Sequence, residues 1–237
     1  GLAATGVDLP SGPVVVLAGD TPLLTGSSLV ELVELHSSQK AAASVLTAIL
    51  DDPTGYGRII RGTDDDRVAR IVEHKDASDD ERTVREINSG VYAFEQQALT
   101  SGLARLTTNN AQGEEYLTDV LGYLVDDGEL VVAQVAADPD EILGVNDRVQ
   151  LAQAGALLRD RINIEWMRQG VTITDPATTW IDASVRLDRD VRIERNTSLI
   201  GPTVVESGAV VGPDTTVDGC VIMANAHVFK SHVVQAR

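Results

Sequence analysis

Residues 181–229 read IDASVRLDRDVRIERNTSLIGPTVVESGAVVGPDTTVDGCVIMANAHVF, and a large apolar residue returns in them at every sixth position. A helix has a period near 3.6 and a half-buried strand a period of 2, so neither explains a period of six. A triangular parallel β-helix does, because each flat face takes one hexad and three hexads complete a coil. The repeat therefore predicts about three coils of a β-helix. The apolar series comprises Ile181, Leu187, Ile193, Leu199, Val205, Val211, Val217, Met223 and Phe229.

A second series supports this interpretation. Four residues after each apolar position, the side chain is small or β-branched in eight of nine cases. We expect the apolar residues to point inward and the smaller ones to fit beside them near the corners. The alternative is a sandwich of ordinary short strands, which turns would separate at irregular intervals. The second series comprises Val185, Val191, Thr197, Thr203, Ala209, Thr215, Val221, His227 and Val233.

A long helix is predicted over 147–170, directly ahead of the repeats. Its apolar positions include Trp166, and Gly170 is a suitable stop. We place the domain boundary along this helix. The sequence thus predicts a first domain over 1–148, a linking helix over 149–170 and the β-helix over 171–237.

Strand-like and helix-like segments alternate ahead of the long helix. Val14–Ala18 is a β-branched run that ends at a Gly-Asp-Thr-Pro turn, which predicts a buried, parallel strand. Ser27 or Ser28 is expected to cap the helix that follows. The alternation indicates an α/β domain with a mostly parallel sheet. Further strands are expected over 43–50, 59–60, 68–72, 87–94 and 130–135, and a helix over 117–125.

Composition limits the partners. The chain has 237 residues, 36 acidic and 19 basic, and a formal net charge of −17. Such a surface repels phosphate backbones and anionic lipid, which argues against nucleic acid and membranes as partners. A small anionic substrate fits only where a local pocket or a divalent cation reverses the field.

The single cysteine and the start of the chain bear on location. Cys220 cannot form an intrachain disulfide, so a reducing, cytoplasmic location is expected, with Cys220 as a small buried hydrophobe. No signal peptide is visible, and the apolar run near the start is too short to span a bilayer. The chain opens on Gly1 without an initiator methionine, which suggests a fragment or a processed product.

A carboxylate follows the predicted strand over 14–18. Asp20 lies where α/β sheets bind ligands, and Gly19 before it permits close approach to the backbone. An oxygen of Asp20 suits Mg²⁺, which takes few protein ligands and completes its shell with phosphate and water. The alternative is a turn that the Asp20 side chain stabilises.

Two further segments carry polar groups next to predicted strands. Gly55 and Gly57 permit tight approach to a sugar or phosphate, and Arg58 could face a phosphate; a plain hairpin turn is the alternative. Glu73 could accept hydrogen bonds from sugar hydroxyls and Lys75 could meet a phosphate. A solvated strand end is the alternative there.

Two asparagines and a polar loop complete the candidates. Asn88 could bind hydroxyls as donor and acceptor at once, or satisfy a turn. Asn146 starts the long helix, so an ordinary N-cap is its alternative role. The loop over 109–114 shows little more than a loop followed by a helix cap. The sequence contains no Ser-His-Asp grouping, zinc-spaced cluster or Walker loop.

The order of these motifs resembles that of the bacterial bifunctional N-acetylglucosamine-1-phosphate uridylyltransferases and glucosamine-1-phosphate N-acetyltransferases. The resemblance covers essentially the whole chain, including the hexad β-helix after a long helix. The motifs are LAGDTPLL (17–24), DDPTGYGRI (51–59), IVEHKDA (71–77), EINSG (86–90), NAQGEEYLTD (110–119) and GVNDR (144–148).

This resemblance implies an incomplete Rossmann-like nucleotidyltransferase domain, then a left-handed parallel β-helix of the acetyltransferase. Members couple UTP to N-acetylglucosamine-1-phosphate with Mg²⁺, acetylate glucosamine-1-phosphate with acetyl-CoA, and form trimers through the β-helix. It implies the following roles: Asp20 and Asn146 as catalytic Mg²⁺ ligands, Ala18 and Gly19 lining the nucleotide site, and Gly57, Glu73 and Asn88 binding the N-acetylglucosamine moiety.

The sequence also departs from the family. The glycine-rich signature that cradles the UTP phosphates and the residues for acetyl transfer are absent, so we expect the isolated chain to be inactive. Two alternatives stay open: a related sugar-1-phosphate nucleotidyltransferase, such as a glucose-1-phosphate adenylyltransferase, and a non-catalytic trimerising module.

Overall fold

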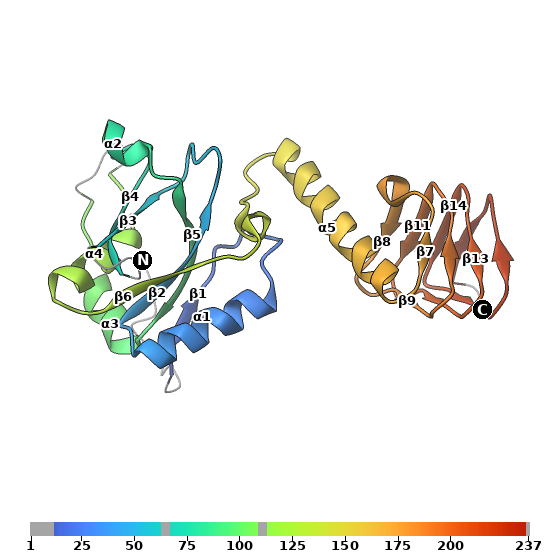
Figure 1. Ribbon diagram of the computed structural model, residues 1–237, viewed down its shortest axis with the longest axis horizontal. Coiled ribbons are helices and arrows are strands. Elements are labelled where there is room, and N and C mark those ends of the chain that lie inside the picture. Colours follow the sequence, from blue (N-terminus) through green and yellow to red (C-terminus); the bar gives the residue numbers. More distant parts are fainter. Residues whose placement is uncertain (1–11, 63–66, 109–112, 236–237) are drawn as a thin grey trace. The chain divides into compact units, whose positions relative to one another are not determined.

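The computed structural model describes residues 12–62, 67–108 and 113–235 (Figure 1). The chain divides into two compact units, Gly1–Asn146 and Asp147–Arg237. None of the helices in the described ranges combines the length and apolarity that a membrane crossing needs.

The first unit is built on a mixed sheet. Its strands are β1 (Val14–Val16), β2 (Ala43–Ile49), β3 (Arg58–Arg61), β4 (Val68–Val72), β5 (Glu86–Phe94) and β6 (Val131–Val135). They run in the order β4-β3-β5-β2-β6, and β1 pairs with β5 off this path. These bounds confirm the expected strands over 43–50, 59–60, 68–72, 87–94 and 130–135 to within one residue at each end.

The prediction of a mostly parallel sheet is wrong. Only β2 and β6 pair in parallel among the described strands of this unit, whereas β5 pairs antiparallel with β1, β2 and β3, and β3 with β4. The chain passes from β3 to β4 through a short connection, which allows an antiparallel pair but not the crossover that a parallel pair needs. The strand β1 is antiparallel and not buried, and Val15 is 39% exposed.

Helices cover both faces of this sheet. They are α1 (Gly26–Gln39) on one face and α3 (Gln96–Leu103) and α4 (Thr118–Asp126) on the other. The short helix α2 (Asp79–Arg82) buries no residue, and the 3₁₀ helix η2 (Pro139–Ile142) follows β6. Leu32 of α1 packs in one core cluster, and Leu99 of α3 and Leu121 of α4 pack in the other. Thr25 caps α1, and the prediction of Ser27 or Ser28 as the cap is wrong. The helix already begins at Gly26, so both serines lie in its first turn, and the Thr25 hydroxyl accepts from the backbone N–H of Ser28 (3.3 Å).

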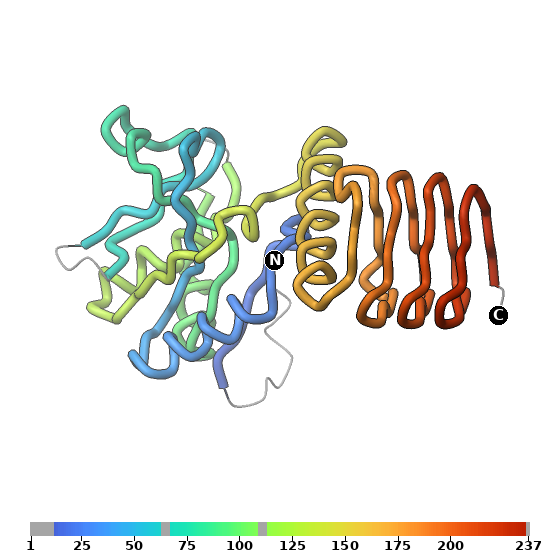
Figure 2. The backbone as a smooth tube through the Cα atoms, turned by 45° about the vertical axis from the view of Figure 1, so that its right-hand side comes forward, coloured from blue at the N-terminus to red at the C-terminus, as the bar shows by residue number. Residues whose placement is uncertain are grey.

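The second unit begins with α5 (Arg148–Arg168), which packs on the first coil of the β-helix (Figure 2). Trp166 lies against the apolar core of the β-helix. The buried Asn163 donates its amide to the carbonyls of Pro176 (3.0 Å) and Thr179 (2.9 Å). The helix and the coils therefore share one core.

Three parallel sheets form the faces of the β-helix. Their orders are β7-β10-β13-β16, β8-β11-β14-β17 and β9-β12-β15. The left-handed β-helix of hexapeptide repeats is confirmed, with three coils and two strands of a fourth in the described residues. The elements are β7 (Thr172–Ile173), η3 (Pro176–Thr178), β8 (Thr179–Ile181), β9 (Arg186–Leu187), β10 (Arg192–Ile193), β11 (Thr197–Ile200), β12 (Val204–Val205), β13 (Val210–Val211), β14 (Thr215–Asp218), β15 (Val221–Ile222), β16 (His227–Val228) and β17 (His232–Val234).

The predicted inward series is right as far as Val217 and wrong for its last two members. All members from Ile181 to Val217 are buried. Met223 is instead 58% exposed and Phe229 is 62% exposed. Their neighbours Ile222 and Val228 take the inward positions.

The cause is a coil that is one residue shorter. Thr197 pairs with Thr215, eighteen residues on, whereas Val205 pairs with Ile222, seventeen residues on. Cys220, which is 1% exposed, accordingly fills the small inward position in place of Val221. The prediction of Cys220 as a small buried hydrophobe is confirmed.

Candidate functional site

The loop after β1 holds Asp20 at its surface. Asp20 is exposed, and the turn is held by Thr21, whose hydroxyl donates to the carbonyl of Ala18 (3.2 Å). The side-chain bond expected from Asp20 in the alternative interpretation is thus supplied by Thr21. A Cβ built on Gly19 would meet no other atom of the described residues within 4 Å. Packing does not require glycine here, which leaves room for a ligand against the backbone.

Asn146 lies beside Asp20. The backbone N–H of Val145 donates to the carbonyl of Asp20 (2.9 Å), which joins the two loops. A Cβ on Gly144 would stand 3.5 Å from Asp20 Oδ2 and 3.8 Å from Asn146 Nδ2, so both side chains border the same glycine. Asp147 caps α5 by accepting from the N–H of Gln150 (2.8 Å). The N-cap role considered for Asn146 is therefore wrong.

The chemistry of this pair fits Mg²⁺. One carboxylate and one amide supply hard oxygen ligands, and Mg²⁺ needs only one or two of these when phosphate and water complete its shell. Within the described ranges, no three His, Cys, Asp or Glu side chains form a cation site. A cation here would consequently depend on phosphate ligands from a substrate.

Gly57, Glu73 and Asn88 come together from three segments. A Cβ on Gly57 would lie 3.4 Å from Glu73 Oε1 and 3.5 Å from Asn88 Cβ. The N–H of Asn88 donates to the carbonyl of Gly57 (2.9 Å). Three residues selected from separate motifs thus border one spot, and glycine keeps that spot open.

Two hydrogen bonds fix the orientation of the Asn88 amide. Its Oδ1 accepts from the N–H of Gly90 (3.2 Å) and from the hydroxyl of Tyr92 (3.0 Å). Burial raises the pKa of Tyr92 above its usual value, so this phenol stays a donor. Asn88 therefore offers its amide N–H groups to a ligand, rather than donor and acceptor together.

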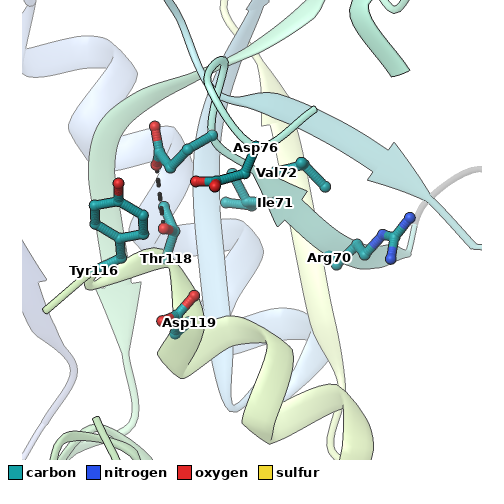
Figure 3. Close-up of a pocket in the computed structure, with 8 residues that line it drawn as sticks. Arg70, Ile71, Val72, Asp76, Tyr116, Thr118 and Asp119 are labelled. Carbon is teal, nitrogen blue, oxygen red and sulfur yellow. Dashed lines mark hydrogen bonds between the residues drawn. The ribbon is translucent and has the colours of Figure 1, made fainter. Parts of the chain in front are cut away.

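Glu73 is held by Thr118. The hydroxyl of Thr118 donates to Glu73 Oε1 (3.2 Å), a contact visible as the dashed line in Figure 3. Burial raises the pKa of Glu73, the Thr118 bond lowers it, and the charges of Asp76 and Asp119 raise it further. The net effect is a carboxyl that is easier to protonate than an ordinary glutamate.

A cavity of about 340 Å³ opens beside Glu73 (Figure 3). Asp76 and Asp119 add acidic groups and Tyr116 adds a phenol to its wall. Burial and the charge of Asp76 raise the pKa of Asp119. Carboxylates and hydroxyls favour a ligand rich in hydrogen-bond donors, such as a sugar ring, over a bare phosphate. The remaining lining residues are Arg70, Ile71, Val72 and Thr118.

The two groups of predicted residues border each other through Ala18. A Cβ on Gly90, whose φ is +78°, would lie 3.3 Å from Ala18 Cβ. Ala18 belongs to the loop of Asp20, and Gly90 follows Asn88 in β5. The loop that carries Asp20 and the strand that carries Asn88 are thus neighbours.

Arg58 does not face a phosphate site, contrary to the sequence-based expectation. It is 1% exposed, and its guanidinium donates to the carbonyl of Tyr56 and to His74 Nδ1 (3.2 Å). The extended strand β3 turns this side chain into the core, where it ties the Gly57 turn to the turn after β4. In the loop over 109–114, residues 109–112 lie outside the described residues.

A mixed α/β unit followed by a long helix and a β-helix defines a class of two-unit proteins with hexapeptide repeats. Within it, the chain is similar to curated proteins described as bifunctional protein GlmU. It is 54% identical to that of Pseudarthrobacter chlorophenolicus over 222 residues, which is 94% of this chain and 45% of the relative. The protein of Mycobacterium marinum is 50% identical over 232 residues, 98% of this chain and 47% of the relative. The family resemblance is thereby confirmed for a partial chain.

The chain spans about half the length of these relatives. No protein-family model matches it. Among solved structures, a putative glucose-1-phosphate thymidylyltransferase from Bacillus anthracis in complex with a sucrose aligns with a TM-score of 0.48 and 21% identity. That alignment covers 63% of this chain and 56% of the other.

Proposed function

We propose that the first unit binds N-acetylglucosamine-1-phosphate and Mg²⁺ in a uridylyl transfer from UTP, as part of a bifunctional enzyme that makes UDP-N-acetylglucosamine. The observation that carries this proposal is the convergence of Gly57, Glu73 and Asn88 from three separate segments. The Asp20–Asn146 pair, whose loop neighbours β5 through Ala18 and Gly90, supports it. Similarity to the GlmU proteins over nearly the whole chain supports it.

Each residue has a role that its contacts allow. Asp20 and Asn146 would hold Mg²⁺, which neutralises phosphate charge during the transfer. Glu73 accepts from sugar hydroxyls while Thr118 fixes its carboxylate, and Asn88 donates through its oriented amide. Gly57 lets the sugar approach the backbone, and Ala18 and Gly19 line the adjacent nucleotide side. No protein nucleophile is required, because in-line displacement needs positioning and charge neutralisation.

Binding of the sugar phosphate tests this assignment. Titration calorimetry with N-acetylglucosamine-1-phosphate is expected to show affinity that depends on Mg²⁺. Asp20→Ala should remove the Mg²⁺ dependence, and Glu73→Ala should weaken binding by about tenfold or more. Glu34→Gln, which removes one exposed negative charge from α1, is the matched control and should bind as the wild type does. Unchanged binding in both Asp20→Ala and Glu73→Ala would contradict the proposal.

We further propose that the β-helix belongs to the acetyltransferase half, which uses acetyl-CoA, and that it assembles as a homotrimer. A cytoplasmic location and an inactive isolated chain complete the proposal. Light scattering that finds only a monomer at high concentration would count against the trimer. Release of pyrophosphate from UTP and N-acetylglucosamine-1-phosphate by the isolated chain would count against its inactivity.

A further inference from the structure

A buried carboxylate lies outside the proposed site. Glu141, in η2, is 9% exposed. Its Oε2 accepts from the hydroxyls of Ser28 (2.5 Å) and Thr25 (3.0 Å). Burying a carboxylate is costly unless hydrogen bonds compensate, and both donors here are neutral hydroxyls. This arrangement therefore calls for an explanation other than simple core packing.

Glu141 connects the two segments that carry the candidate cation ligands. Thr25 follows Asp20 by five residues, and Glu141 precedes Asn146 by five residues. The hydrogen bonds of Glu141 join these segments at one end. At the other end, the N–H of Val145 donates to the carbonyl of Asp20 (2.9 Å). The two segments are thus joined at two points, one at the ligand pair itself and one five residues away from it along each segment.

The electrostatics favour this fastening. Thr25 is the N-cap of α1, so its hydroxyl accepts from the N–H of Ser28 while donating to Glu141. A carboxylate at the N-terminus of a helix interacts favourably with the helix dipole. Hydrogen bonds to a charged acceptor are stronger than those between neutral groups. Glu141 therefore attaches the segment that leads to Asn146 to the N-terminus of α1, where the Asp20 loop ends.

We infer that Glu141 is a positioning residue, which holds Asp20 and Asn146 at the spacing that a divalent cation needs. This inference rests on the proposed role of the Asp20–Asn146 pair. A Cβ at Gly144 would lie in van der Waals contact with both ligands, so the segment from Glu141 to Asn146 passes directly beside them. Loss of the Glu141 acceptor would leave the buried hydroxyl of Ser28 and the half-buried hydroxyl of Thr25 without this partner, and would let the two segments separate.

Amide hydrogen exchange of Val145 tests the fastening without any metal. In Glu141→Met, which keeps the length but removes the acceptor, exchange at Val145 should accelerate about tenfold. The amide of Ala93 in β5 should change much less. Glu141→Gln retains one acceptor oxygen and should stay within about threefold of the wild type. Glu34→Gln removes one exposed charge and should leave both amides unchanged.

Mn²⁺ affinity in the presence of saturating N-acetylglucosamine-1-phosphate, which supplies phosphate ligands, tests the effect on the cation pair; electron paramagnetic resonance below the unfolding temperature measures it. Glu141→Met should raise the dissociation constant about five- to tenfold, Glu141→Gln much less, and Asp20→Ala should abolish specific binding. Equal acceleration at Val145 and Ala93 would overturn the inference, because Glu141 would then serve only global stability. Unchanged Mn²⁺ affinity in Glu141→Met would overturn it as well. Wild-type protein that binds no Mn²⁺ would refute the proposed function, whereas acceleration confined to Val145 would still support the fastening.

Discussion

The β-helix and the α/β unit bury polar groups of different kinds. In the β-helix these are threonines whose hydroxyls bond to carbonyls close by in the chain, as Thr203 does to Ile200 (2.6 Å) and Thr215 to Pro213 (3.0 Å). The α/β unit instead buries charged side chains, Arg58 and Glu141, that join distant segments. Groups that can fix ligands in space are therefore concentrated in the α/β unit.

The two regions also differ in how strongly each position is specified. An inward residue of the β-helix repeats the surroundings of the residue one coil earlier, as the pairing of Leu199 with Val217 shows. In the α/β unit, β2 lies between an antiparallel and a parallel neighbour, and no other strand in the described part of this unit shares that environment. Because the β-helix repeats one environment, its fold can be predicted from the sequence period. The α/β unit has no such repeat, so each of its positions has its own surroundings.

The largest expected effect tests the shortened coil. Ile222→Ala should destabilise the β-helix by about 3 kcal/mol, because it removes a buried branched side chain from the stack. Met223→Ala should change stability by less than about 0.5 kcal/mol, since this side chain is exposed. Urea unfolding of both variants measures the difference. A larger loss of stability in Met223→Ala than in Ile222→Ala would instead indicate that the six-residue period continues without interruption.

A smaller effect is expected where α5 meets the first coil. Asn163→Ala removes two hydrogen bonds to backbone carbonyls and should cost about 2 kcal/mol. Gln169→Ala removes an exposed bond to Glu165 and is the control, with an expected cost below about 0.5 kcal/mol. Thermal unfolding followed by circular dichroism measures both. Equal stability of the two variants would show that the Asn163 hydrogen bonds do not hold α5 to the β-helix.

In the α/β unit, a local cap should matter less than either. Ser78 forms a capping box with Glu81 at the start of α2. Ser78→Ala should cost about 1 kcal/mol. Ser101→Ala removes an exposed hydroxyl within α3 and should cost less than about 0.5 kcal/mol. A cost for Ser78→Ala as large as that of a core truncation would show that α2 stabilises more of the unit than its own turn.

The smallest effect should have the opposite sign. The pKa of Glu73 is raised in the folded protein, so the native state binds more protons than the unfolded state between the ordinary and the raised pKa. This group therefore lowers stability as pH rises through that window. Glu73→Gln should raise the Tm by about 2 °C at neutral pH, with the gain lost below about pH 4. Calorimetry across this pH range checks it, and a lower Tm at neutral pH would contradict it.

Sequence predicted each fold element to the extent that its signal was local. The strands from Ala43 to Val135 and the helix over 117–125 were evident from their apolar runs, whereas strand directions depend on pairing that no run encodes. The slip after Val217 was hidden because Met223 and Phe229 are apolar and continue the period by coincidence. The sequence period therefore identifies the β-helix, but only the strand pairing shows which side chains point inward.

The candidate site followed a similar rule. The roles of Asp20, Glu73 and Asn88 stay predictions, although the structure brings Glu73 and Asn88 together at Gly57 and sets Asp20 beside Asn146 at Gly144. Thr118 is not among the predicted site residues, and its bond to Glu73 has no local signal in the sequence. No local sequence signal marks Glu141, because its hydroxyl partner Thr25 lies 116 residues away in sequence. Arg58 was misassigned because a basic residue after glycines resembles a phosphate contact.

The strand order of the α/β unit has a consequence for how the chain reaches its native state. The parallel pair β2–β6 joins residues far apart in the chain, such as Ala43 and Val131, whereas each coil of the β-helix pairs with the coil just before it. Closing long loops slows folding, and repeats propagate from any nucleus. During refolding, the coils should therefore form early, while the parallel pair that completes the sheet closes late.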